Sequence, residues 1–235
     1  MKRIIADIHT HTIASGHAYG TIREMAQAAG EKGLEVLGFA EHAPGIPGTV
    51  HPFYFLNLEV IPQTLYGVRL IHGSEVNILS DGTLSLEERY LQRLDYAVAG
   101  IHLTCYEDAG RERNTANVIA CMRHEKVKLI SHPDDDATPL DYALLTEAAL
   151  ETGTALEVNN SSLVKNHRKN CVENYRTMLR LCREKGAPVI VSSDAHDPSW
   201  VGRFELAETL LEEENFPSEL VLNTDRERLL TFLGM

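Results

Sequence analysis

The sequence predicts an α/β protein that folds as one domain over residues 1–235, in the form of a (β/α)7 barrel resembling a TIM barrel. Short runs of Ile, Val and Leu alternate with helical patterns along the whole chain, as expected of parallel strands buried on both faces. No linker rich in Pro, Gly or Ser divides the chain, and 235 residues suit one such barrel. An open, doubly wound sheet is the alternative, but no GxGxxG motif supports a nucleotide-binding version of it.

The expected strands are short, nearly continuous apolar runs. They cover 3–8, 35–40, 68–75, 96–101, 128–131, 154–158 and 188–193. The strands and the helices between them form one βα unit fewer than the eight of a regular barrel.

The expected helices show apolar residues at helical spacing. They cover 21–32, 85–93, 116–124, 142–152, 172–185, 202–213 and 225–233. Gly33, Gly153 and Gly186 follow three of these runs, as glycines that end helices do. A helix over 57–65 is a weaker prediction, because Pro62 interrupts it.

Composition narrows the classes of partner. Acidic residues outnumber basic ones by 34 to 22, which gives a net charge of −12 and makes nucleic acid an unlikely partner. No apolar run approaches the roughly 18 residues of a membrane span, and the first residues do not resemble a signal peptide. Four scattered cysteines without a CxxC pair fit a reducing compartment. We therefore expect a cytoplasmic protein without membrane contact, and the sequence does not indicate its oligomeric state.

Histidines and carboxylates follow the ends of most expected strands. The set is His9, His11, His17, His42, Glu75, His102, His132, Asp194 and His196. Since the carboxyl ends of the strands in a parallel barrel meet at one rim, we expect these side chains to converge. Imidazole and carboxylate groups without thiolates indicate a catalytic site for zinc, iron or manganese. Nine such groups are many for two ions and suit three.

The sequence around these residues resembles a known family. The segments are Asp7-Ile8-His9-Thr10-His11, Glu41-His42, Glu75, His102, Ser131-His132-Pro133 and Ser193-Asp194-Ala195-His196. They resemble the motifs of the PHP (polymerase and histidinol phosphatase) superfamily. The segments Ser15-Gly16-His17-Ala18-Tyr19 and Asn159-Asn160-Ser161-Ser162 are similar to its YcdX-like branch of single-domain phosphatases.

The resemblance implies a distorted (β/α)7 barrel of the PHP type with three divalent ions, most often zinc, with iron or manganese as alternatives. It implies that His9, His11, Glu75 and Asp194 hold the first ion. Glu75 would bridge to a second ion held by His102 and His132. His17, His42 and His196 would hold the third.

The expected reaction is hydrolysis of a small phosphate monoester, in which hydroxide on the metal attacks phosphorus. We assign catalysis to Glu75, Asp194 and His196, and expect no Ser or Cys nucleophile. Asn159, Ser161 and Arg168 are predicted to contact the substrate. For Arg168 the competing interpretation is a solvated loop over 165–169, in which His167 is a further, weaker candidate.

Three details remain open at this stage. Asp7, which lies two residues before His9 and is expected on the same face, either orients a ligand or fills a layer of the barrel, and the same two roles are open for Glu41. Where YcdX-like relatives tend to carry Gly-Asn-Pro after Pro133, this chain has three acids, Asp134 to Asp136. They form a solvated loop, repel polyanions, or favour a cationic group on the leaving portion of the substrate.

Other functions are alternatives. The chain could be a phosphodiesterase or exonuclease acting on nucleotides or nucleic-acid ends, or an enzyme of the histidinol-phosphatase type. Metals could also serve only to hold the fold. A metal-dependent amidohydrolase would share the His-x-His start but gives no reason for His17, His102 and Glu75 together.

Overall fold

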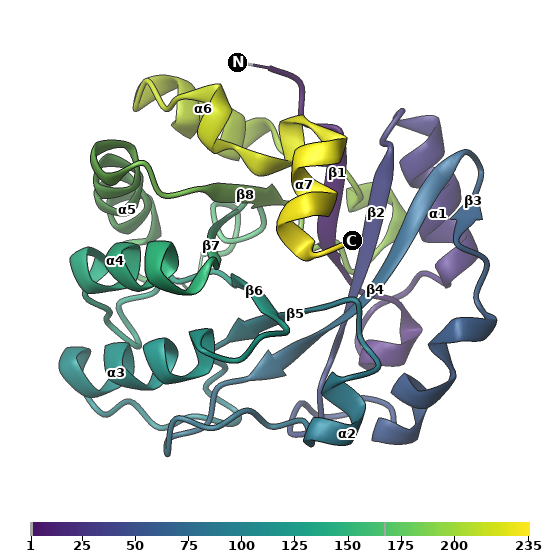
Figure 1. Cartoon of the computed structure of the whole chain (residues 1–235), viewed down its shortest axis with the longest axis horizontal. Helices are drawn as coiled ribbons and strands as arrows, with labels where there is room; N and C mark the ends of the chain where they lie inside the picture. The colour runs from purple at the N-terminus through teal and green to yellow at the C-terminus, as the bar shows by residue number, and fades with distance from the viewer. Residues whose placement is uncertain (1, 167) are drawn as a thin grey trace.

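The computed structural model describes residues 2–166 and 168–235, and it confirms the α/β, barrel-like fold (Figure 1). An eight-stranded sheet has the order β1-β2-β4-β5-β6-β7-β8, with parallel neighbours, and a short β3 pairs antiparallel with β4. The strands are β1 (Ala6–Thr10), β2 (Val36–His42), β3 (Thr64–Leu65), β4 (Val68–Asn77), β5 (Tyr96–Gly100), β6 (Val127–Ile130), β7 (Ala155–Asn159) and β8 (Val189–Ser192). Every expected strand is present, and only β3 was not predicted.

The helices also follow the prediction closely. They are α1 (Ile22–Glu31), α2 (Glu88–Leu91), α3 (Arg111–Met122), α4 (Tyr142–Thr152), α5 (Cys171–Lys185), α6 (Glu205–Glu213) and α7 (Arg226–Leu233). Gly153 and Gly186 end α4 and α5 with φ of 67° and 76°, a conformation in which glycine avoids the strain of a side chain. No helix in the described ranges is both long and apolar enough to cross a membrane.

The prediction of a helix over 57–65 is wrong. A 3-10 helix, η2, covers Pro52–Val60 and begins with a proline at its first position, where a missing N–H costs nothing. The chain is extended at Ile61, directly before Pro62, as expected of a residue that precedes proline. Residues 64–65 then form β3. Further 3-10 turns are η1 (Ile13–Ser15), η3 (Pro198–Trp200), η4 (Ser218–Leu220) and η5 (Leu222–Thr224).

Apolar side chains fill the barrel at the amino ends of its strands. Ala6, Val36 and Ala155 contribute to a buried cluster that also contains Leu229 and Leu233 of α7. Helix α7 therefore closes this end of the barrel, and the polar residues lie at the opposite, carboxyl-terminal rim. A second, larger cluster lies between the sheet and the surrounding helices.

The barrel is nearly closed, and one side chain joins its two edge strands. Within the described ranges, β1 and β8 form no ladder, and a single bridge pairs Thr10 with Ala195. The buried Asn223 amide donates from Nδ2 to the carbonyl oxygens of Ala6 and Val191, both at 2.7 Å, and its Oδ1 accepts from the Val191 amide at 3.2 Å. Asn223 thus satisfies backbone groups that an eighth parallel strand would otherwise satisfy.

An irregularity in β1 changes which of its side chains face inward. The β1–β2 register shifts between Asp7 and Thr10. Asp7 accepts hydrogen bonds from Ser193, whereas His9 contacts Glu157, which also accepts from the Ser192 hydroxyl. Ser192 and Ser193 are adjacent in an extended segment, so their side chains point to opposite faces of the sheet. Asp7, which bonds to Ser193, therefore lies on the face opposite to His9, which is linked to Ser192 through Glu157. The expectation that they share a face is wrong, since the irregularity re-aims the strand, as β-bulges do.

Candidate metal centre

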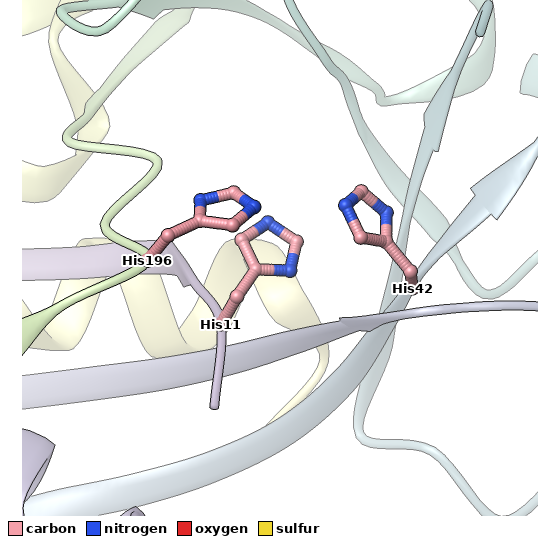
Figure 2. A group of neighbouring side chains, drawn as sticks. All are labelled: His11, His42 and His196. Atoms are coloured by element: carbon pink, nitrogen blue, oxygen red, sulfur yellow. The ribbon is translucent and has the colours of Figure 1, made fainter. Parts of the chain in front are cut away.

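The rim brings together all nine side chains that the sequence singled out. His11, His42 and His196 approach one another from three different strand ends (Figure 2). The ring centroids of His11 and His42 are 4.4 Å apart, and those of His11 and His196 are 4.2 Å apart. His17 adds a fourth ring, with its Nε2 atom 3.1 Å from His196 Nε2.

The Glu75 carboxylate lies among the histidines, and its two oxygens face different groups. Oε2 is 3.3 Å from His9 Nε2 and 3.0 Å from His42 Nδ1. Oε1 is 3.2 Å from His102 Nε2 and 2.9 Å from His132 Nε2. A carboxylate with nitrogen ligands on both sides has the arrangement of a group that bridges two cations.

Among the described residues, candidate ligand atoms gather in three overlapping groups, each within 4.8 Å. The groups are His9, His11 and Glu75; His42, Glu75 and His102; and His11, His42 and His196. Asp194 lies beside the first group, with Oδ1 3.3 Å from His11 Nε2. His42 belongs to two groups, so the geometry does not separate the second and third ligand sets that the resemblance implies.

The donor atoms fit divalent ions. His9 Nε2, His11 Nε2 and His42 Nδ1 are buried and make no hydrogen bond within the described residues. Buried nitrogens without a partner are costly in an apolar interior. Because they lie beside the carboxylates of Glu75 and Asp194, their lone pairs and these oxygens are suited to sharing metal ions.

Glu157 holds His9 in place, a role that the sequence analysis missed. Its Oε1 accepts from His9 Nδ1 at 2.6 Å and from the Ser192 hydroxyl. Its Oε2 accepts from the His132 amide at 2.6 Å and from Asn159 Nδ2 at 3.1 Å. Since Nδ1 of His9 donates to Glu157, the lone pair of this imidazole lies on Nε2, toward Glu75.

A second chain of hydrogen bonds orients His11. The Ser15 hydroxyl donates to Glu41 Oε2 at 2.6 Å and lies 3.0 Å from His11 Nδ1. Because that hydroxyl proton is committed to Glu41, Ser15 accepts from His11 Nδ1–H and leaves Nε2 with the lone pair. Of the two roles open for Glu41, the contacts favour orientation of a ligand. Asn77 acts similarly, with Oδ1 2.8 Å from His102 Nδ1.

The charges at the rim keep two carboxylates ionised and one imidazole neutral. Burial alone would raise the pKa of Glu75, but His102, His9 and His42 outweigh burial and hold it well below its usual value. Burial likewise opposes a lowered pKa for Asp194, yet Lys165 and the neighbouring histidines hold it well below its usual value. Burial and the Arg168 charge lower the pKa of His132 to about 4. These carboxylates are therefore ionised, and His132 is neutral, at neutral pH.

Lys165 is a further site residue that the sequence analysis did not single out. Its Nζ atom is 3.1 Å from Asp194 Oδ2, and its side chain is half-buried. Its only signal in the sequence is its position in the basic segment 165–169.

The backbone is strained at two candidate ligands. His132 and Asp194 have positive φ values of 31° and 52°. Such values are uncommon for residues other than glycine and cluster at functional sites. Gly100 adds a close approach, because a Cβ atom there would lie 2.1 Å from Ser131 Oγ and 3.2 Å from Glu75 Oε1. The absence of a side chain at Gly100 leaves room for the Glu75 carboxylate.

The predicted substrate contacts lie in different surroundings. Arg168 lines a cavity together with His132. Asn159 is fully buried, donates to Glu157 and accepts from the Ser162 amide, and neither it nor Ser161 lines this cavity. His167 lies outside the described residues.

The acidic run is not a simple solvated loop. Asp134 is fully buried and accepts from Arg168 at 3.0 Å and from the Tyr175 hydroxyl at 3.2 Å. Burial raises the pKa of Asp134 to about 6, although Arg168 opposes this effect. The first acid of the run therefore fixes Arg168 beside the cavity.

A parallel barrel with imidazoles and carboxylates gathered at its carboxyl-terminal rim has the donor groups of a site that could hold divalent ions. Residues 7–187 match the model of the PHP domain, and the chain belongs to this family. A probable phosphatase of Acetivibrio thermocellus is 41% identical over 227 residues, which cover 96% of this chain and 93% of that protein. A probable phosphatase of Caldanaerobacter subterraneus is 42% identical over 233 residues, which cover 98% of this chain and 91% of that protein.

A solved structure shows the same fold at lower identity. It is histidinol phosphate phosphatase from Lactococcus lactis, complexed with zinc, L-histidinol and phosphate. The two chains are 18% identical, with a TM-score of 0.62 and coverage of 91% of this chain and 95% of that one. The likeness confirms the PHP type of barrel.

Proposed function

We propose that this protein is a metal-dependent phosphatase that hydrolyses small phosphate monoesters at a site for three divalent ions, most often zinc. The observation that carries the proposal is the position of Glu75, whose two oxygens face separate groups of histidines. The names of the relatives support the same class of reaction, because two proteins more than 40% identical to this chain are named probable phosphatases.

The ligand sets of the proposal follow the resemblance. His9, His11, Glu75 and Asp194 would hold one ion, Glu75, His102 and His132 a second, and His17, His42 and His196 a third. Divalent ions at such a site neutralise phosphate oxygens and lower the pKa of water, so that no side-chain nucleophile is needed. Glu75, Asp194 and His196 are the proposed catalytic residues.

The chain's own cations would bind and orient the phosphate. Arg168 lies at the cavity, fixed by Asp134, and its guanidinium suits two phosphate oxygens at once. Lys165, beside Asp194, is a second candidate. Of the three proposed substrate contacts, Arg168 has the best support, because Asn159 already hydrogen-bonds within the protein.

Net charge favours a small substrate over a polymer. Three divalent ions would add six positive charges to a chain of net charge −12, and these charges would be concentrated at the rim. The rest of the surface would still repel a long polyphosphate backbone.

The test is elemental analysis of protein purified without chelator, followed by release of p-nitrophenol from p-nitrophenyl phosphate and from its bis ester, with inorganic phosphate measured for the monoester. We expect more than one metal per chain and faster hydrolysis of the monoester. Glu75→Gln should lose both metal and activity, whereas Glu151→Gln, on the exposed face of α4, should lose neither. Fewer than two metals per chain together with no phosphate release would contradict the proposal, and preference for the bis ester would favour a phosphodiesterase.

A further inference from the structure

A cavity of about 510 Å³ opens beside the candidate metal centre. One part of its lining consists of the candidate ligands His17, His42, His102 and His132. A volume of this size lies within the range of about 300–1,000 Å³ that is usual for sites that enclose small molecules. The cavity therefore offers room beyond the space that a phosphate group occupies at the metals.

Apolar side chains form much of the remaining lining of the cavity. Ile78, Val118, Ile130 and Leu140 line it and are each at most 7% exposed. They come from the segment after β4, from α3, from the end of β6 and from the segment before α4. Ile46, Ile101 and Leu103 extend this apolar lining. We call these seven residues the apolar chamber.

The polar groups of the lining are mostly engaged with other residues. The Ser131 hydroxyl donates to Glu75 Oε1 at 2.8 Å, and Asp134 accepts from Arg168, Tyr175 and Ser162. Thr104 and Thr138 add two further hydroxyls. A leaving group rich in hydroxyls would give up its bonds to water in the chamber and find few partners there, which is unfavourable.

We propose that the apolar chamber holds the leaving group, and that the preferred substrates are phosphate monoesters of apolar alcohols or phenols rather than of sugars or polyols. The proposal rests on the proposed phosphatase function. The phosphate would lie against the histidines and Arg168, and the carbon portion would lie in the chamber. Hydrolysis breaks the bond between phosphorus and the ester oxygen, water supplies the new oxygen on phosphorus, and a proton passes to the leaving oxygen. The products are inorganic phosphate and an apolar alcohol.

The test is a series of n-alkyl phosphates from ethyl to hexyl, compared with glycerol 1-phosphate and a hexose 6-phosphate, on the metal-loaded protein. Because the leaving alkanols have nearly the same acidity, their rates report contacts with the carbon chain. We expect kcat/KM to rise about fourfold with each methylene until the chamber is filled, and hexyl phosphate to exceed both polyol esters. Inhibition by n-alkylphosphonates, which are not hydrolysed, should strengthen with chain length in the same way.

Two variants locate the effect. Leu103→Asn changes a side chain that is 63% exposed at the cavity and should leave folding unaffected, while Leu140→Asn places an amide of similar shape in a buried part of the chamber. Both should lower the ratio of kcat/KM between hexyl and ethyl phosphate, by roughly tenfold for Leu140→Asn. Leu150→Asn, at a position on α4 that is 46% exposed and outside the cavity, is the matched control and should keep the ratio of the unmodified protein.

The outcomes separate the two proposals. If the polyol esters are hydrolysed as well as hexyl phosphate, or if chain length has no effect in the unmodified protein, the leaving-group proposal is wrong and the phosphatase function stands. If both chamber variants keep the ratio of kcat/KM between hexyl and ethyl phosphate, the leaving-group proposal is likewise wrong and the phosphatase function stands. If no ester, p-nitrophenyl phosphate included, releases phosphate in the presence of zinc, iron or manganese, then the phosphatase function fails and the leaving-group proposal fails with it.

Discussion

Replacement of Glu157 by glutamine tests whether this buried carboxylate sets the metal affinity of the rim. Glu157 accepts four hydrogen bonds, two on each oxygen, from His9, Ser192, His132 and Asn159. A glutamine keeps one oxygen and presents an NH₂ group in place of the other. Turned toward His132 and Asn159, the NH₂ group would face two N–H donors. Turned toward His9 and Ser192, it would face the His9 N–H, whereas the Ser192 hydroxyl can accept from it.

The expected magnitude follows from these contacts. Each hydrogen bond to a charged group contributes about 1.5–3 kcal/mol, so that the loss of one or two amounts to roughly 1.5–6 kcal/mol before relaxation. The loss for the metal is smaller, because Glu157 touches a ligand and not the ion. Loss of such a partner typically lowers metal affinity about 10- to 100-fold, which corresponds to about 1.4–2.8 kcal/mol.

The assay is competition for zinc between the metal-free protein and a chromophoric chelator, at a temperature where circular dichroism shows Glu157→Gln to be folded. Glu151→Gln, on the exposed face of α4, is the matched control and should bind zinc as the unmodified protein does. A folded Glu157→Gln variant with zinc affinity within twofold of the unmodified protein would refute the assignment of Glu157 as the group that orients His9.

Three further predictions concern packing, closure and the thiols. Gly100→Ala should weaken zinc binding and destabilise the fold by about 1–3 kcal/mol, because its methyl would collide with Ser131 Oγ; chelator competition and urea denaturation measure the two effects. Asn223→Ala should lower the free energy of unfolding by about 2–4 kcal/mol in urea, because it leaves buried backbone groups of both edge strands unpaired. Burial raises the pKa of Cys121 and Cys182 to about 12, so that alkylation of the native protein at pH 8 should spare both thiols in a mass-spectrometric map. In the unfolded chain the same thiols ionise near pH 9, whereas in the folded protein they stay protonated up to about pH 12. The free energy of unfolding should therefore decrease as the pH rises from about 9 to 12.

Each of these predictions has an outcome that would contradict it. Gly100→Ala with unchanged zinc affinity would mean that Glu75 does not depend on the space at residue 100. Asn57→Ala, at an exposed asparagine of η2, is the control for Asn223→Ala, and equal stability of the two variants would contradict the role of Asn223. Labelling of Cys121 or Cys182 as rapid as that of the less buried Cys105 would show that the buried thiols are accessible.

The strands and the convergence of the nine side chains were predictable because both depend on local patterns. Runs of Ile, Val and Leu define the parallel strands, and a parallel barrel carries every strand end to one rim. The irregularity of β1 was not predictable, because a shift in strand pairing leaves no mark in the sequence. Asp7, His9 and His11 alternate along the chain whether or not the shift is present. The sequence therefore placed Asp7 on the wrong face.

The supporting residues were harder to predict because they depend on distant partners. Glu157 lies between Leu156 and Val158, in a strand expected to be buried on both faces, and a carboxylate in that position requires a partner. That signal was present, but His9 lies 148 residues away. Asp134 and Arg168 are separated by 34 residues, and only the fold brings their charges together. Side chains that bind ligands recur in motifs, whereas the groups that orient them are visible only in three dimensions.

The junction between β1 and β8 has a consequence for motion as well as for stability. Asn223 bonds to Ala6 at the start of β1 and to Val191 in β8. Near the rim, one bridge within the described residues joins Thr10 to Ala195, just after β8. β1 leads to His11 and β8 leads to Asp194, so that an ion shared by these two residues would fasten the same junction from above. Removal of metal should therefore speed amide hydrogen exchange in β1 and β8 more than in β4 and β5, which are paired on both sides. Bound metal would then stabilise the junction between β1 and β8 and so help to close the barrel.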